Sequence, residues 1–275
     1  FSYEKKTGLG TLLDHRIHGS LPFAGDYRVV DFIISSMVNA GIRDVGIIMH
    51  GKCQSLLDHL GTGKSWDLSR NYGGLTLLPA FAYGESGEYG GSFRGKLEAL
   101  HCVRDYLQSI TQEYVVMSDS DVVINLPLDD VLRWHRDTGA DITAVCTAEM
   151  DGSADTCFQL DRDGRIVDTA CNAEASEGYR CLDIFVMKTA LLRQLVDECV
   201  AHSRYSFARN VLQDMVDTLH IHGYVWDGYA AKIDSVQSYF EKSMELLRPE
   251  IRAELFDPRR PIHAKLSDSA STFID

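Results

Sequence analysis

The stretch EYVVMSDSD, residues 113–121, contains the pattern that decides the fold. Its first part, Tyr114–Met117, is an apolar run rich in strand-forming residues, and the chain then changes at once to alternating serine and aspartate. A buried strand that ends in a carboxylate is typical of open α/β sheets, which bind ligands beyond the carboxyl ends of their strands. Asp121 in this place can hold a divalent cation against a phosphate. Taken alone, the same pattern favours a simple cap of the following turn by Asp119 or Asp121.

Apolar residues recur at helical and strand spacing on both sides of this stretch. Glycines at positions 41 and 139 predict the ends of two of the helices. The alternating order of strands and helices predicts a doubly wound sheet with parallel strands. The expected elements are helices at 29–42, 55–60, 95–110 and 126–139, and strands at 45–49, 75–78, 114–117 and 141–148.

The second half of the chain predicts a mixed, partly antiparallel lobe. Its strongest turn signal is Asp163-Gly164, which predicts a hairpin over residues 158–168. Ser235 is a suitable N-cap for the last long helix. The other expected elements are strands at 181–188 and 222–234, and helices at 189–201, 207–218 and 235–247.

Composition excludes several classes of function. The formal net charge is −13, so we expect no nucleic-acid partner. No apolar run is long enough to span a bilayer, and we expect no membrane association. The seven cysteines are odd in number and form no CxxC pair, which favours reduced thiols and a cytoplasmic protein. The chain begins at Phe1 and ends in a polar segment, so we expect it to be part of a longer protein.

A second candidate site lies at Arg94, Gly95 and Lys96, before an expected helix. Free backbone N–H groups at a helix N-terminus favour anions, and two basic side chains add to that field. A solvated basic turn explains the same residues equally well. The loop at residues 1–15, with Gly8 and Gly10, has too few glycines to predict a phosphate-binding loop from its composition.

Several stretches together resemble the glucose-1-phosphate adenylyltransferase family (ADP-glucose pyrophosphorylases). These are LPFAGDYRVVDFIISSMVNAGIRDVGII (21–48), FRGKLEAL (93–100), EYVVMSDSDVVINLPLDDVLRWH (113–135), GYAAKIDSVQSYFEKSMELL (228–247) and RRPIHAKLSDS near the end. The resemblance implies a nucleotidyltransferase fold, an α/β fold with a doubly wound, mixed and mostly parallel sheet. It implies one such domain over residues 1–250, with a nucleotide half at 1–150 and a sugar or partner half at 151–250. Residues 251–275 would then be a linker toward the family's C-terminal left-handed β-helix, which we expect to be absent from this chain.

The family makes ADP-glucose and pyrophosphate from ATP and glucose 1-phosphate, and two aspartates hold its Mg²⁺. By this resemblance, the family's first metal-binding aspartate aligns with Asp121, which follows Ser120. The position of the second metal-binding aspartate is occupied by Lys232. A protonated lysine cannot ligate Mg²⁺, and Asp234 lies roughly 7 Å further along the strand, at about 3.3 Å per residue. We expect Lys232 to form an ion pair with Asp121 in place of the metal.

This chain also differs from the family's motifs at other positions. The glycine-rich nucleotide loop becomes YEKKTGL (3–9), and the sugar-phosphate lysine has no counterpart near CNAEA (171–175). Lys96 and Leu97 stand where the family has smaller residues in its base pocket. The region of the family's activator site implies a set of effector candidates, Arg16, His18, Arg28 and Gln54.

These departures resemble the GlgD-type regulatory subunits of that family. The resemblance implies a catalytically deficient chain in bacterial glycogen biosynthesis that assembles with a catalytic subunit, as a heterotetramer, and binds no Mg²⁺ productively. An active adenylyltransferase with a rearranged Mg²⁺ site, using Asp119, Asp121 and Asp234, is one alternative. An effector-binding scaffold that takes a phosphorylated metabolite and no sugar nucleotide is another.

Overall fold

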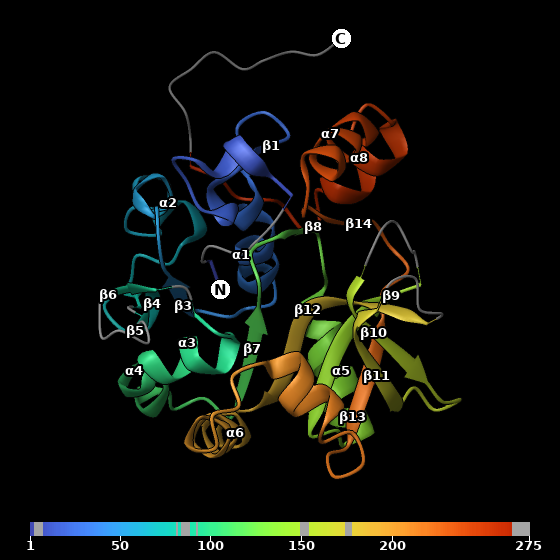
Figure 1. Ribbon diagram of the computed structural model, residues 1–275. Helices are drawn as coiled ribbons and strands as arrows, with labels where there is room; N and C mark the ends of the chain where they lie inside the picture. Colours follow the sequence, from blue (N-terminus) through green and yellow to red (C-terminus); the bar gives the residue numbers. More distant parts are fainter. Residues whose placement is uncertain are drawn as a thin grey trace. The chain divides into compact units, whose positions relative to one another are not determined.

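The chain folds into two compact units whose segments alternate along the sequence. The structure, a computed structural model, describes residues 1–2, 8–80, 82–83, 89–91, 93–148, 154–173 and 178–265 (Figure 1). We call the units the first unit (Phe1–Pro79, Ser120–Leu128 and Gly228–Asp275) and the second unit (Ala80–Asp119 and Asp129–Asp227). The halves expected at 1–150 and 151–250 remain a prediction.

The first unit contains the helix expected at 29–42 and the strand expected at 45–49. Helix α1 (Val29–Asn39) begins where the Asp31 carboxylate accepts the Arg28 backbone N–H at 2.9 Å, and it ends before Gly41, whose φ is 80°. Strand β3 (Asp44–Met49) pairs in parallel with β4 (Gly74–Pro79). The apolar faces of α1, β3 and α2 (Gln54–Leu60) meet in one buried cluster around Trp66. The shorter elements here are η1 (Gly10–Leu13), η2 (His18–Ser20), β1 (Pro22–Phe23), β2 (Tyr27–Arg28) and η3 (Lys64–Trp66).

Two later segments of the chain complete the first unit. Strand β8 (Val122–Ile124) pairs antiparallel with β14 (Ala230–Lys232), and the helices α7 (Val236–Glu245) and α8 (Pro249–Leu255) follow. The Ser235 hydroxyl accepts the Ser238 backbone N–H at 3.0 Å, which confirms the predicted N-cap. Helix α8 lies at the start of the region that we expected to be a linker.

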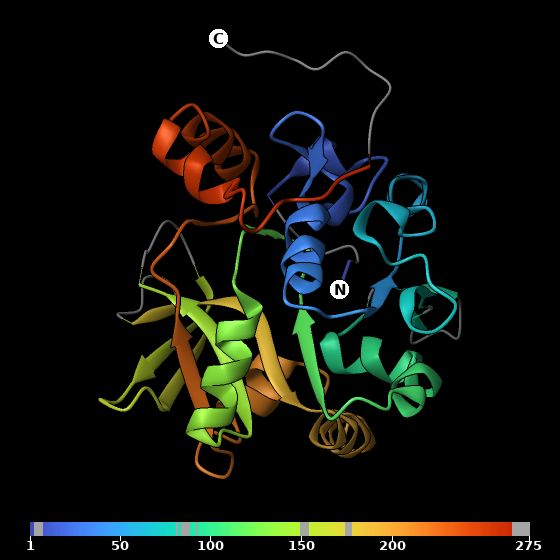
Figure 2. The same ribbon diagram turned by 180° about the vertical axis from the view of Figure 1, so that it is seen from behind.

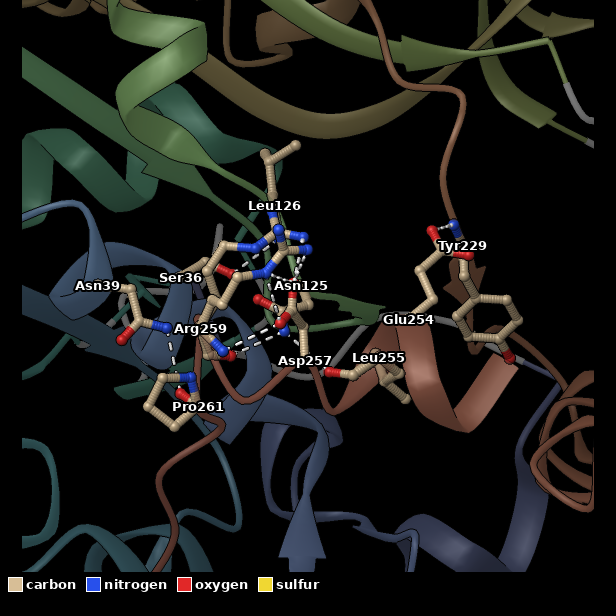
Figure 3. A network of polar contacts seen from close by, with 11 residues as sticks. Ser36, Asn39, Asn125, Leu126, Tyr229, Glu254, Leu255, Asp257, Arg259 and Pro261 are labelled. Atoms are coloured by element: carbon tan, nitrogen blue, oxygen red, sulfur yellow. Dashed lines mark hydrogen bonds and ion pairs between the residues drawn. The ribbon is translucent and has the colours of Figure 1, made fainter. Parts of the chain in front are cut away.

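The segment that follows α8 is held by side chains from earlier in the sequence (Figure 3). The buried Asn125 amide donates to the Leu255 carbonyl and to the Arg260 carbonyl, both at 2.9 Å. Asn39, on α1, donates to the Pro261 carbonyl at 3.1 Å. These bonds satisfy backbone carbonyls that no helix or strand would pair.

The second unit is built on a six-stranded sheet with the order β11-β10-β12-β9-β13, in which β7 also pairs with β12. Only β9 and β13 are parallel neighbours, and the other pairs are antiparallel. Because β12 lies antiparallel to β7, β9 and β10, those three strands and β13 share one direction. The mixed α/β fold that we expected is therefore confirmed. The strands are β7 (Tyr114–Ser118), β9 (Ile142–Thr147), β10 (Ala154–Leu160), β11 (Ile166–Ala173), β12 (Tyr179–Lys188) and β13 (Ile221–Val225).

Helices cover both faces of this sheet, as a doubly wound fold requires (Figures 1 and 2). Helix α5 (Leu128–Thr138) packs on one face, where the buried His135 ring bonds to Thr143 of β9 at 2.8 Å. The π-helix η4 (Ala208–Gln213) lies on the other face, where its Leu212 carbonyl accepts the Thr169 hydroxyl at 3.2 Å. The remaining elements are α3 (Lys96–Cys102), α4 (Arg104–Ser109), α6 (Thr189–Ala201), β5 (Ala82–Tyr83) and β6 (Tyr89–Gly91).

Three expectations from the sequence pattern are wrong in detail. Residues 222–234 are not one strand, because β13 and β14 belong to different units. The helix expected from Gly95 onward is two helices, since Val103 leaves the helical region at φ −110° and ψ 29°. The helix expected over 207–218 is the shorter η4 followed by turns. Among the described residues, no helix is long and apolar enough to cross a membrane.

Candidate functional site

The second unit places Asp119 directly after β7. Its carboxylate is buried, and the residue is only 1% exposed. The Asp119 backbone N–H donates to the Asp183 carbonyl of β12 at 3.3 Å, so the strand end is fixed against the neighbouring strand. A carboxylate buried to this degree requires a cation or several hydrogen-bond donors close by.

Lys96 supplies that cation from the first residue of α3. Its ammonium lies 3.2 Å from Oδ2 of Asp119 and forms a second ion pair with Asp183. The side chains of Lys96 and Asp183 are 12% and 13% exposed, so solvent screens these pairs little. The ammonium also lies 5.4 Å from the centre of the Phe185 ring. We call Lys96, Asp119 and Asp183 the lysine–aspartate cluster.

Asp183 is a site residue that the sequence pattern did not reveal. It interrupts the strand CLDIFVMK with a φ of 56° at a register shift between Cys181 and Ile184. A bulge of this kind re-aims a side chain that the regular alternation of a strand would place differently. An acidic residue in the middle of an apolar strand was the available signal.

The stretch Arg94-Gly95-Lys96 lies at the start of α3, as predicted. Gly95 is required because a Cβ there would lie 2.1 Å from the Tyr205 carbonyl oxygen. The Arg94 guanidinium donates to the Glu98 carboxylate at 2.6 and 3.0 Å and lies 3.7 Å above the Tyr205 ring. Glu98 also accepts the Arg94 backbone N–H at 2.7 Å, which places a carboxylate at the helix start. The two basic side chains of this stretch therefore face carboxylates of the same unit.

The first unit places Ser120, Asp121 and Lys232 on neighbouring segments. The Ser120 hydroxyl donates to the Phe1 carbonyl at 2.9 Å. Lys232 of β14 lies directly opposite Val122 of β8, and the backbone N–H of Ile233 donates to the Asp121 carbonyl at 2.9 Å. Asp121 is 4% exposed and Lys232 is 7% exposed. The predicted ion pair between these two side chains remains a prediction; Asp121 directly precedes β8, and Lys232 lies on the neighbouring strand β14.

The main chain of Asp234 is hydrogen-bonded to the segment that aligns with the family's nucleotide loop. Its carbonyl accepts the Gly8 backbone N–H at 2.9 Å, and the Gly8 carbonyl accepts the Val236 N–H at 3.1 Å. Residues 3–7 of the loop, with Tyr3, Glu4 and Lys6, lie outside the described residues. The end of the CNAEA stretch, residues 174 and 175, lies outside them as well.

Of the four effector candidates, Arg28 has the best-defined contacts. Its guanidinium donates to the backbone carbonyl and the hydroxyl of Ser55, at 2.6 and 2.9 Å. Burial lowers the pKa of Arg28, and a neighbouring Arg16 lowers it further, against the opposing effect of Asp31. Gln54 is exposed and donates to Asp58 at 2.8 Å. His18 is buried in η2.

A buried hydrogen bond between a carboxyl group and an imidazole lies beside Arg28. The Asp31 carboxylate is fully buried and bonds to Nε2 of His59 at 2.7 Å. Burial raises the pKa of Asp31, although His59 and the Arg28 backbone N–H act in the opposite direction. Helices α1 and α2 are thus joined by polar as well as apolar contacts.

The predicted site residues therefore fall into two groups. Arg94, Gly95 and Lys96 belong to the second unit, together with Asp119 and Asp183. The remaining seven belong to the first unit, and they are Arg16, His18, Arg28, Gln54, Ser120, Asp121 and Lys232.

Comparison with known proteins gives one family. Residues 15–162, more than half of the chain, match the family model described as nucleotidyl transferase. The chain is 37% identical to the glycogen biosynthesis protein GlgD of Bacillus subtilis over 270 residues, which cover 97% of this chain and 68% of that protein. It is 35% identical to the protein of the same name from Geobacillus stearothermophilus, over 96% of this chain and 67% of the relative. A glucose-1-phosphate adenylyltransferase of Pseudothermotoga lettingae is 30% identical over 90% of this chain and 60% of its own length.

Proposed function

Because the chain belongs to the nucleotidyl transferase family, among the glucose-1-phosphate adenylyltransferases and GlgD proteins, we propose that it acts in glycogen biosynthesis as a regulatory, catalytically deficient subunit. Its partner in this proposal is a catalytic glucose-1-phosphate adenylyltransferase. The chain spans between 60% and 68% of the length of the relatives named above, so the activity and partners of the whole protein are proposals.

The observation that carries the proposal is the burial of Lys232 on β14. The family resemblance places a metal-binding aspartate at this position, and Asp121 at the facing one. A buried ammonium has three donors and no acceptor, so it cannot ligate a cation. Without a carboxylate at position 232, the aspartate pair expected from the family resemblance is incomplete, and Mg²⁺ demands several oxygen ligands in near-octahedral geometry. We propose that no Mg²⁺ is held productively.

The lysine–aspartate cluster supports the same proposal independently. The resemblance places Lys96 in the family's base pocket, where smaller residues are expected. Here its ammonium is fixed between two carboxylates of its own unit. A nucleotide would have to displace a buried, paired charge, which is costly because each partner would lose its compensation.

A regulatory subunit without its own chemistry should alter the catalysis of its partner. The test compares ADP-glucose synthesis by three samples, which are the purified full-length protein, the catalytic subunit and the co-expressed pair. We expect negligible turnover by the first sample, and changed activity or effector response in the pair relative to the catalytic subunit. If the purified protein made ADP-glucose at a rate near that of the catalytic subunit, the proposed catalytic deficiency would be refuted.

One substitution tests the metal-binding position separately from the effect on the catalytic partner. Lys232→Asp restores the second carboxylate, and we expect it to increase any Mg²⁺-dependent turnover of the isolated protein. Lys188→Asp, at an exposed position, makes the same charge change elsewhere and serves as the matched control. If the pair with Lys232→Asp has the same activity and effector response as the pair with the wild-type chain, regulation does not depend on this position.

We also propose that the effector candidates respond to a phosphorylated metabolite. Arg16 is the residue to substitute first, because the Arg28 guanidinium is bonded to Ser55 and the Gln54 amide to Asp58. A thermal-shift titration with sugar phosphates tests this point. No shift in the wild-type protein, or equal shifts in Arg16→Ala and wild type, would count against it.

A further inference from the structure

We propose that His220 and His222 form a binding site for a divalent transition-metal ion, with Zn²⁺ as its ligand. The site lies in the second unit, whereas Lys232, which carries the proposed function, belongs to the first unit. His220 directly precedes β13, and His222 is the second residue of that strand. Residues two apart in an extended chain project to the same face. Their Nε2 atoms lie 3.1 Å apart.

This separation suits two ligands of one ion. Imidazole nitrogens bind Zn²⁺ at about 2.0–2.1 Å, so two of them 3.1 Å apart subtend an angle of roughly 100° at the ion. That angle lies between the right angle of octahedral sites and the tetrahedral angle of zinc sites. Imidazole is a borderline ligand that suits Zn²⁺, Cu²⁺ and Ni²⁺, whereas Mg²⁺ prefers oxygen.

The second nitrogen of His220 is already held in the manner of a metal ligand. Its Nδ1 bonds to the Gly139 carbonyl at 3.5 Å, and its backbone N–H donates to the Asp141 carboxylate at 2.8 Å. We assign the Nδ1 proton to the bond with Gly139, because a carbonyl can only accept. The Nε2 of His220 then carries a lone pair, and the Nε2–H of His222 donates to it. Backbone carbonyls orient many metal-ligating histidines in this way.

The surroundings of His222 lower the pKa of its imidazole. The ring is 6% exposed, and burial lowers its pKa, with a further contribution from His220. Asp161 and Asp163, on the turn between β10 and β11, oppose this effect, and Arg165 on the same turn reinforces it. A neutral imidazole is the form that binds metal ions.

Binding replaces one N–H···N bond by two nitrogen–metal bonds. The proton on Nε2 of His222 moves to its Nδ1, and water completes the coordination of the ion. Among the described residues, this buried Nδ1 has no hydrogen-bond partner, so protonating it reduces the affinity. We therefore expect one weak Zn²⁺ site with two protein ligands.

The test is calorimetric titration of the purified protein with Zn²⁺, and with Mg²⁺ for comparison. His220→Ala should weaken Zn²⁺ binding by roughly tenfold or more, since even the loss of an outer-shell partner has effects of that size. His202→Ala is the matched control, because its ring is exposed and bonds to the Glu198 carbonyl of α6. Cys102→Ser tests the exposed thiol as a competing ligand.

A second variant tests whether a loss of Zn²⁺ binding is caused by misfolding. His222→Asn keeps a polar side chain at the buried position and should also weaken Zn²⁺ binding, with an unchanged far-ultraviolet circular dichroism spectrum. Wild-type Zn²⁺ affinity in His220→Ala would overturn the proposal. Loss of binding in Cys102→Ser, or no Zn²⁺ binding by the wild-type protein, would overturn it too.

Discussion

Replacing Lys96 by methionine should destabilise the second unit more than any other single change of a charged residue that we consider. The substitution keeps the length of the side chain and removes its charge from between Asp119 and Asp183. Coulomb's law at an effective dielectric constant near 20 gives about 5 kcal/mol of gross attraction for charges 3.2 Å apart. Desolvation of both partners offsets much of this in the wild-type protein.

The substitution leaves two buried carboxylates without their cation. Breaking a buried ion pair by removing one partner costs about 3–5 kcal/mol, and we expect Lys96→Met to lower the free energy of unfolding by that amount. This is a large fraction of the roughly 5–15 kcal/mol that stabilises a typical domain. Urea titration followed by tryptophan fluorescence measures the change, and hydrogen exchange assigns it to the second unit.

Lys188→Met is the matched control for this experiment. Lys188 is exposed at the end of β12, and we expect its substitution to change the free energy of unfolding by less than about 0.5 kcal/mol. Lys96→Arg retains the charge and should fall between the two. A loss below about 1 kcal/mol in Lys96→Met would refute the reasoning, because it would mean that the two carboxylates do not depend on this ammonium.

Three further predictions concern other parts of the structure. Asn125→Ala leaves two backbone carbonyls without their donor and should cost about 2–4 kcal/mol in urea titrations, against less than about 1 kcal/mol for the exposed, singly bonded Asn39→Ala. Gly95→Ala should lower the melting temperature, since the new Cβ meets a backbone carbonyl and overpacking costs about 1–3 kcal/mol; an unchanged melting temperature would disprove the close approach. Hydrogen bonds from Arg259 lower the pKa of Asp257 to about 2, so its stabilising contribution is present above pH 4 and is lost as the pH falls toward 2. An NMR titration should give that midpoint, and Arg259→Gln should raise it toward 3.8, whereas equal midpoints would contradict this cause.

Elements with strong local periodicity were predictable from the sequence. Helix α6 has the predicted bounds Thr189–Ala201, and α1 ends before the predicted stop at Gly41. Their apolar stripes pack against neighbouring elements, so pattern and tertiary structure agree. The hairpin turn at Asp163-Gly164 is confirmed for the same reason, since Gly164 has the positive φ that such turns require.

Features that depend on distant residues were not predictable. The alternating pattern of residues 222–234 continues across the passage from β13 to β14, where the Trp226 N–H bonds to the Cys146 carbonyl. Periodicity describes which residues are buried, and it contains no information on which sheet buries them. Asp183 belongs to the site because the Lys96 ammonium, 87 residues earlier in the sequence, forms an ion pair with its carboxylate. The family resemblance, in contrast, identified Asp121 and Lys232, which lie on neighbouring segments of the chain, because positions shared within a family preserve such long-range relationships.

The alternation of segments between the two units limits how this protein can be cut. Five consecutive segments belong in turn to the first, second, first, second and first unit, so the chain passes between units four times. Any single truncation within residues 80–227 therefore removes part of the first unit, and a truncation from the C-terminus removes the strand that carries Lys232. Expression of an isolated N-terminal or C-terminal fragment should yield aggregating or protease-sensitive material. Fragment complementation or circular permutation is the suitable way to dissect this chain, and deletion series are not.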